Sequence, residues 1–401
     1  MSRSFFRLLM YVALAAMALW LTNCGSSSNS TTGSTGGSGS GGGSTAAYAA
    51  GVGGAGQTSS AKFLYAVQVP GLTPFATTIN SGGTLTKATV SVGQYSVFNP
   101  MGMMAAIDPT GTYFYQAVEP GLWAFTINRQ NGNLTENSAS PYDSTVNFEA
   151  VAVDQLGKYV YGFGGGQVYA YSIQSGGQLT AVAGSPFAAA TSGEQYAIPF
   201  DRIAVSQDDK YLYVGTSTGI FGYSINASTG ALTPVAGSPF GASAGASGGL
   251  IAPATGFLYE LTSGNSQTGI FGYSMNDSTG ALTAIAGSPF GKCTGGSHLT
   301  SPASGKFLFG ASCGMYSIDS SSGALTFVTA DPTAPYSTWA VFDPPGDMLW
   351  LVTSPLPCFS CEIGPEAFQV DASGNLTEVQ NSFFLITDSE VGGIQALALT
   401  Q

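Results

Sequence analysis

The sequence predicts an all-β fold, a seven-bladed β-propeller built from four-stranded antiparallel blades. The stretch 220–241, IFGYSINASTGALTPVAGSPFG, returns at 270–291 with 18 of its 22 residues identical. A repeat of about fifty residues indicates units that bury their apolar faces only against one another. The chain also has 56 glycines and 12% aromatic residues, which suit short strands and tight turns. No stretch has the pattern of a long amphipathic helix.

Each repeat carries one signature: an aromatic residue, any residue, an aliphatic residue, Asn or Asp, a Ser/Gly turn, and then Leu-Thr. Alternation followed by a turn that contains glycine is the signal of a β-hairpin. A second strand of aromatic and aliphatic residues precedes each hairpin, and in most repeats a small apolar strand precedes that one. Four strands per unit and seven units predict a propeller. The Leu-Thr steps begin at Leu85, Leu134, Leu179, Leu232, Leu282, Leu325 and Leu376.

The two ends of the repeat array predict how the ring closes. The first unit has no inner strand before Phe63, whereas a spare strand remains at 393–399. If this last strand becomes the inner strand of the first blade, the ring has no open edge between its ends. We therefore expect the propeller to span 61–401.

The residues of the repeat resemble a known family. The stretch 202–240, RIAVSQDDKYLYVGTSTGIFGYSINASTGALTPVAGSPF, looks like the seven-bladed lactonase family, which includes 6-phosphogluconolactonase-like proteins and muconate-lactone-forming enzymes and merges into YVTN-type surface propellers. The resemblance covers nearly all of 61–401 and concerns the residues that build blades. It implies the propeller fold and, for activity, lactone chemistry.

The segment before the propeller predicts export and a lipid anchor. Arg3 and Arg7 precede an apolar run of fourteen residues, 8–21, which is the layout of a signal peptide and too short to span a membrane. Residues 21–25, LTNCG, resemble the lipobox of bacterial lipoproteins, so removal of 1–23 would leave Cys24 as the lipidated residue. The Gly/Ser/Thr-rich segment 24–60 is expected to be a disordered linker. The predicted location is the bacterial cell envelope, tethered to a membrane through the lipid alone.

Charge and composition narrow the expected partners and cofactors. Ten Lys and Arg stand against 22 Asp and Glu, and the net charge is −12. Such a surface cannot neutralise a run of phosphates, so we expect no nucleic-acid partner. A single histidine excludes a metal site built on histidines, and no glycine-rich phosphate loop leads into a helix. We therefore expect a monomer without a cofactor or metal, whose ligand is a small lactone or a glycan.

The candidate site residues lie where the blades differ, at the start of each inner strand, because ligands usually bind at the mouth of the channel. Arg202 could clamp a carboxylate or a lactone carbonyl through two oxygens. His298 could act as the general base that delivers water, or as the proton donor in the reverse direction. The predicted strand starts are Met104, Ala150, Arg202, His298 and Trp339.

Acidic residues accompany these positions. Glu194 or Glu149 would orient His298 or restore its protonation state. Asp201, Trp339 and Met104 would contact the ligand. The resemblance agrees in residue type, since the lactone-forming members of the family are thought to use His, Arg and an acid at the channel. It implies a catalytic set of Arg202, His298, Glu194 and Glu149.

Two other interpretations remain open. In one, Arg202 pairs with Asp201 or Glu149 at the rim and His298 bonds a loop backbone, so the protein is a non-catalytic surface propeller that binds a glycan or a protein. In the other, Ser312 in the G-x-S-x-G pattern GASCG would be a nucleophile beside His298. That pattern carries meaning only on a strand-to-helix elbow, and it recurs by composition in a chain this rich in Gly and Ser.

Besides Cys24 the chain has four cysteines. An even number in an exported protein favours disulfides, and their places near one face predict the bridges Cys293–Cys313 and Cys358–Cys361. The C-x-x-C spacing of the second pair also fits a redox or metal half-site. Those functions need a βαβ context or a second pair of ligands, and the sequence shows neither.

Overall fold

The computed structural model describes one compact unit of the chain, within 43–401. The leader, Cys24 and the linker lie outside the described residues, as does the pair Cys358 and Cys361. The described residues are 62–69, 74–80, 85–87, 104–118, 120–189, 202–241, 247–253, 256–262, 269–291, 293, 298–334, 337–343, 346–353, 364–380, 382 and 393–399.

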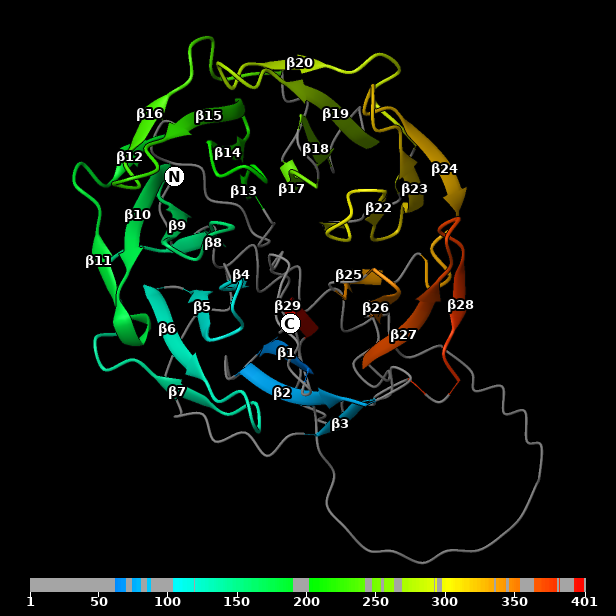
Figure 1. Cartoon of the computed structure of the whole chain (residues 1–401), viewed down its shortest axis with the longest axis horizontal. Helices are drawn as coiled ribbons and strands as arrows, with labels where there is room; N and C mark the ends of the chain where they lie inside the picture. The colour runs from blue at the N-terminus through cyan, green and yellow to red at the C-terminus, as the bar shows by residue number, and fades with distance from the viewer. Residues whose placement is uncertain are drawn as a thin grey trace, which may run out of the picture. The chain divides into compact units, whose positions relative to one another are not determined.

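The described strands form seven antiparallel sheets that stand around a ring as blades (Figure 1). This confirms the predicted fold class. From the inner strand outward, the first two blades are β29 (Gly393–Leu399), β1 (Lys62–Val69), β2 (Pro74–Ile79) and β3 (Leu85–Lys87), and then β4 (Met104–Ile107), β5 (Tyr113–Ala117), β6 (Leu122–Ile127) and β7 (Leu134–Glu136). The third blade is β8 (Phe148–Val153), β9 (Tyr159–Gly164), β10 (Gln167–Ile173) and β11 (Leu179–Ala181), with β12 (Phe187–Ala188) also on β10, and the fourth is β13 (Ile203–Val205), β14 (Tyr211–Thr216), β15 (Gly219–Ile225) and β16 (Leu232–Pro234). The last three blades are β17 (Ser247–Ile251), β18 (Phe257–Thr262), β19 (Gly269–Met275) and β20 (Leu282–Ala284); β21 (Leu299–Thr300), β22 (Phe307–Gly310), β23 (Gly314–Ile318) and β24 (Leu325–Thr329); and β25 (Ser337–Phe342), β26 (Met348–Thr353), β27 (Gly364–Val370) and β28 (Leu376–Glu378).

The repeat signature marks the outer strands correctly, because every outer strand begins at its predicted Leu. Four inner strands begin one or two residues away from their predicted starts. β8 and β25 begin two residues before Ala150 and Trp339. A β-bulge in each strand adds an unpaired residue, so the start of the strand shifts relative to a regular ladder. Arg202 and His298 stand one residue before β13 and β21. Among the described residues the only helix is the 3₁₀ turn η1 (Ser175–Gly177).

Neighbouring blades are joined by a contact that recurs around the ring. The buried hydroxyl of a tyrosine in the second strand of one blade donates a hydrogen bond to the carbonyl of a glycine in the outer hairpin of the next blade. The acceptor glycines have a left-handed φ, for example +72° at Gly280, and their bare Cα faces an aromatic ring of the preceding blade. The bonds are Tyr65 to Gly132, Tyr115 to Gly177, Tyr161 to Gly230, Tyr213 to Gly280 and Tyr259 to Gly323.

The Ser-Pro-aromatic sequence that ends many repeats is also structural. The Ser238 hydroxyl accepts the N–H of Gly222 at 3.0 Å, and Ser288 bonds Gly272 in the same way. The chain then returns to the edge of the third strand, where Phe240 pairs with Ile220. The near-identical repeats are therefore built from blade-forming residues.

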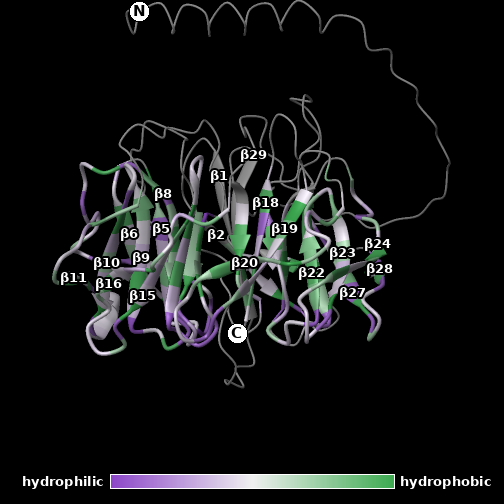
Figure 2. Cartoon of the chain, turned by 90° about the horizontal axis from the view of Figure 1, so that it is seen from above, coloured by the Kyte–Doolittle hydropathy of each residue, from purple (hydrophilic) through white to green (hydrophobic). Residues whose placement is uncertain are grey.

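The ring closes as predicted. β29 pairs antiparallel with β1, from Leu399 opposite Leu64 to Gly393 opposite Val69, and it also neighbours the inner strands β4 and β25. Seen edge-on in Figure 2, hydrophobic residues fill the strands and hydrophilic residues gather in the loops at the two ends of the blades. Within the part of the chain that the structure describes, no helix is long and apolar enough to cross a membrane.

Candidate functional site

Arg202 and Glu149 form an ion pair between two adjacent blades. Glu149 lies in β8 and Arg202 directly precedes β13, and the Arg202 Nη1 atom is 3.7 Å from the Glu149 Oε2 atom. The Arg202 side chain is 1% exposed and that of Glu149 is 19% exposed. The backbone of Arg202 is fixed as well, because its carbonyl accepts the N–H of Gly215 at 2.8 Å. A buried guanidinium is costly to desolvate, so Glu149 is the natural counter-charge.

His298 and Trp339 form a second contact, between the blades of β21 and β25. Their ring centroids are 4.3 Å apart with an interplanar angle of 44°. His298 is 1% exposed. Burial lowers the pKa of the imidazole to about 3, and a hydrogen bond with the backbone of Ala340 opposes this shift. The side chain is therefore neutral at physiological pH.

The structure thus arranges four of the predicted site residues as two pairs, and each pair joins an inner strand to the residue that precedes the inner strand of an adjacent blade. The pair of Glu149 and Arg202 joins β8 to the start of β13, and the pair of His298 and Trp339 joins the start of β21 to β25. The blade of β17 lies between the two in chain order. Glu149 is the acid that the structure places beside Arg202. Glu194 and Asp201, the other predicted acids, lie outside the described residues.

Met104, which the sequence predicts as a ligand contact, packs among apolar side chains. It is fully buried, in the apolar cluster that also holds Ala150, Trp339 and Trp350.

The predicted disulfide Cys293–Cys313 is present, with its Cα atoms 4.5 Å apart. It joins the segment that leads into β21 to the turn between β22 and β23. Ser312 lies in this turn with φ +60°, so the GASCG pattern is a strand-to-strand turn and not the elbow that a nucleophile motif requires.

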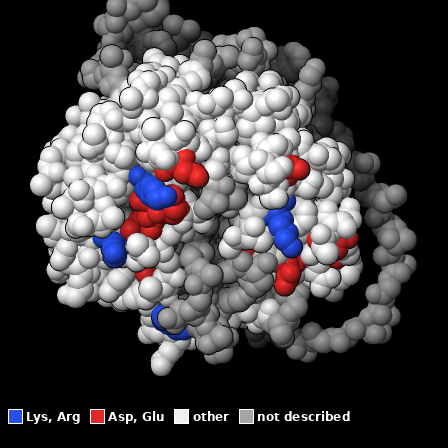
Figure 3. Space-filling model, turned by 45° about the horizontal axis from the view of Figure 1, so that its top comes forward, with Lys and Arg blue, Asp and Glu red and all other residues white. Residues whose placement is uncertain are grey.

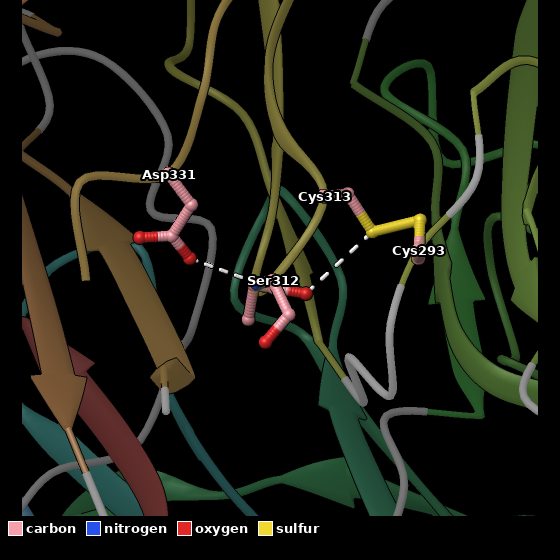
Figure 4. Close-up of a disulfide and its surroundings, with 5 residues drawn as sticks. Cys293, Ser312, Cys313 and Asp331 are labelled. Atoms are coloured by element: carbon pink, nitrogen blue, oxygen red, sulfur yellow. Dashed lines mark hydrogen bonds between the residues drawn. A yellow bond between two sulfur atoms is a disulfide. The ribbon is translucent and has the colours of Figure 1, made fainter. Parts of the chain in front are cut away.

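Asp331 is a buried residue that the sequence arguments missed. Its Oδ2 accepts the N–H of Ser312 at 2.8 Å, and its Oδ1 accepts the N–H and the hydroxyl of Thr333. Figure 4 shows it directed at the turn that holds the disulfide. A sequence signal exists in the D-P-T run that follows β24, since Asp commonly caps such turns.

Charged groups are few and do not gather as a metal site. On the face seen in Figure 3, the Lys and Arg side chains are isolated, and acidic groups lie beside several of them. Among the described residues, no three His, Cys, Asp or Glu side chains group closely enough to hold a metal ion.

Comparisons with solved structures agree with this architecture. A proposed 6-phosphogluconolactonase from Bacteroides fragilis is 16% identical and superposes with a TM-score of 0.60, covering 86% of this chain and 99% of the other. A proposed 6-phosphogluconolactonase from Bacteroides uniformis is also 16% identical, with a TM-score of 0.61 and coverage of 84% and 98%. A protein from Lactobacillus plantarum has 16% identity, a TM-score of 0.59 and coverage of 85% and 99%.

These similarities show the fold: the chain is a seven-bladed propeller like those of the 6-phosphogluconolactonase-like proteins, as the sequence predicts. No family model matches the sequence, and no curated protein matches it. At this identity the shared fold does not by itself carry an activity.

Proposed function

We propose that the protein is a lactonase-like hydrolase that opens a small sugar or carboxylate lactone at the inner ring of its propeller. The observation that carries the proposal is the placement of His298 and Arg202. The single histidine of the chain and one of its ten basic residues are both buried at the starts of inner strands. Burying such groups costs free energy, so buried titratable groups at an inner ring are candidates for function.

In the proposed reaction, His298 takes a proton from water while the water oxygen bonds to the lactone carbonyl carbon. The ring C–O bond then breaks, and the proton passes from His298 to the departing ring oxygen. The Arg202 guanidinium holds the carbonyl oxygen or a substrate carboxylate, and Glu149 keeps the guanidinium in place. The pKa of about 3 makes His298 a weak base. Proton transfer to it therefore depends on the negative charge that develops on the carbonyl oxygen in the same transition state, which stabilises the forming imidazolium.

The chemistry of the chain favours an unphosphorylated substrate. Arg202 is paired with Glu149, and the whole chain has only ten basic residues. A phosphate dianion would need several cationic or N–H donors. We therefore propose sugar lactones and simple carboxylate lactones as the substrate class, in place of 6-phosphogluconolactone.

The test is lactone hydrolysis by the purified chain, followed as acid release in a pH-stat with glucono-δ-lactone and γ-butyrolactone. We expect His298→Ala to lower kcat at least about a hundredfold, the usual worth of a general base. Tyr213→Phe, which removes a hydrogen bond between blades elsewhere in the ring, is the matched control and should keep its kcat. Equal turnover by His298→Ala and wild type would remove His298 from the mechanism.

A second function is favoured by the same contacts. Arg202 has its counter-charge and His298 is packed on Trp339, and both arrangements suit a purely structural role in a propeller that binds a glycan or a protein at its rim. If wild-type protein opens neither lactone, binding should be sought instead, on a glycan array with the same sample. Binding that survives His298→Ala would establish the non-catalytic function.

We also propose that the protein is an exported lipoprotein, held to a membrane through Cys24. The support is the leader and the LTNCG sequence. In a bacterial host, the wild-type chain should partition into the membrane fraction and incorporate labelled fatty acid. Cys24→Ser should do neither, and membrane association that persists in this variant would refute the lipid anchor.

A further inference from the structure

The turn between β22 and β23 is tied to three other parts of the chain. It is closed by the N–H of Cys313, which donates to the Gly310 carbonyl at 2.8 Å. At its centre Ser312 has φ +60°, a left-handed conformation that residues other than glycine rarely adopt. Such a conformation persists where the surroundings hold it, and the structure supplies three contacts that do so. Figure 4 shows two of them, the disulfide and the hydrogen bond to Asp331.

Each contact comes from a different segment. The Cys313 sulfur is bonded to Cys293, in the segment that leads into β21. The Ser312 N–H donates to Asp331, in the segment that leads into β25. The Ala311 N–H donates to the carbonyl of His298 at 3.1 Å. The turn therefore connects the disulfide and a buried carboxylate directly to the backbone of His298.

His298 needs such support because the strand that follows it is short. β21 has two residues, which pair with Gly310 and Phe309 of β22. Every other inner strand among the described residues has three or more. His298 also lies inside the covalent loop that the disulfide closes, five positions after Cys293, so the bridge limits how far the histidine can move from the Ala311 N–H.

We propose that the Cys293–Cys313 bridge and Asp331 are positioning groups for His298, and that they act through the turn 311–313 to keep the imidazole buried against Trp339. A positioning group acts by holding another residue in its productive place. The contribution to catalysis rests on the proposed function of His298. The positioning itself does not, so the two can be measured separately.

The single histidine makes the test direct, because its imidazole gives one set of side-chain NMR signals. The imidazole packs on the Trp339 ring and has a hydrogen bond with the backbone of Ala340. Burial is the largest cause of its lowered pKa, so its titration reports mainly on burial. If the imidazole becomes exposed to solvent, its pKa should rise from about 3 toward the ordinary value of 6.5.

The experiment compares wild type, Cys293→Ala/Cys313→Ala and Asp331→Asn by NMR titration of His298, with the fold monitored by circular dichroism. In Asp331→Asn the one remaining side-chain oxygen is favoured at the position that accepts two hydrogen bonds from Thr333. The amide N–H₂ then faces the Ser312 N–H and cannot accept it, so this contact is lost while the bridge stays. We expect both variants to show a raised histidine pKa. Tyr213→Phe, which breaks a contact between other blades, is the control and should keep the wild-type value.

The outcomes separate the positioning from the chemistry. A folded variant that keeps the wild-type histidine pKa overturns the positioning role of the group it lacks. If the double cysteine variant fails to fold, Asp331→Asn alone decides whether the turn positions His298. If the histidine pKa is raised in the variants but the wild-type protein hydrolyses no lactone, the positioning role is supported and the proposed hydrolase function is rejected. Lactone turnover with unchanged kcat in both variants, despite a raised pKa, shows that the position of His298 does not limit the reaction.

Discussion

The hydroxyl of Tyr213 donates a 2.8 Å hydrogen bond to the carbonyl of Gly280, which belongs to the next blade. Both groups are buried, so each would be left without its partner if the blades separated. Four further tyrosines make the same contact around the ring. Cohesion between blades therefore depends on polar bonds as well as on apolar packing.

Tyr213→Phe should lower the free energy of unfolding by about 1–3 kcal/mol, because a buried carbonyl loses its donor. Urea denaturation measures the change. Tyr169→Phe is the matched control, since the Tyr169 hydroxyl is only part-buried and bonds within its own strand, to Gln167 at 3.4 Å. The control should change stability by less than about 0.5 kcal/mol. Equal losses in the two variants would contradict a special role for the contact between blades.

Phe309→Tyr should restore this contact where it is missing. Phe309 occupies the place of Tyr213 in the blade of β22, and the ring of Phe307 covers Gly374 as the ring of Tyr211 covers Gly280. A hydroxyl at this position should reach the Gly374 carbonyl and stabilise the fold by up to about 1 kcal/mol. The urea midpoint reports the change, and a fall in the midpoint would show that the closed core has no room for the added oxygen.

Gly177→Ala should destabilise the protein more than Gly176→Ala. Both glycines have a left-handed φ, +76° and +82°. A Cβ on Gly177 would lie 2.4 Å from the Tyr113 ring, whereas one on Gly176 meets nothing within 4 Å. We expect a loss of about 1 kcal/mol at Gly176 from the backbone alone, and a further loss of about 1–3 kcal/mol at Gly177 from overpacking. Thermal unfolding of the two variants measures the difference, and equal losses would mean that Tyr113 moves aside freely.

Asp209 should make the protein less stable as the pH rises from 4 to 6. Desolvation and the nearby Asp154 carboxylate raise the pKa of Asp209 from 3.8 to about 6, so between these values the folded state binds more protons than the unfolded state. The free energy of unfolding therefore falls with rising pH across this window. Asp209→Asn keeps an acceptor for the Gln155 N–H and suits the φ of +57°. Urea titrations at pH 4 and pH 7 should show a smaller fall in the variant, and an unchanged fall would rule out Asp209 as its source.

Sequence reasoning succeeded where structure follows from local pattern. The Leu of each Leu-Thr step begins an outer strand because the hairpin turn before it leaves no other register. The inner strands were placed less accurately. Counting back from the second strand assumes a regular ladder, and the bulges beside Ala150 and Trp339 break that assumption.

The contacts of the candidate site residues could not be predicted from the sequence. Arg202 and His298 were proposed because they are rare residue types near inner-strand starts. The Cys293–Cys313 bridge was predicted because one cysteine leads into the blade and the other follows its second strand, near the same face. The partners of these residues depend on which blades adjoin and how their loops fold. No local pattern indicates that Asp331 reaches back to Ser312, nor that Trp339 packs on His298.

The pairing of β29 with β1 has a consequence for biosynthesis. The first blade to leave the ribosome remains incomplete until residues 393–399 are made, and at roughly 5–20 residues per second this delay is on the order of tens of seconds. During that time the inner edge of β1 has no partner strand and could recruit one from another chain. A protein of this design would therefore gain from a factor that covers the β1 edge until synthesis is finished.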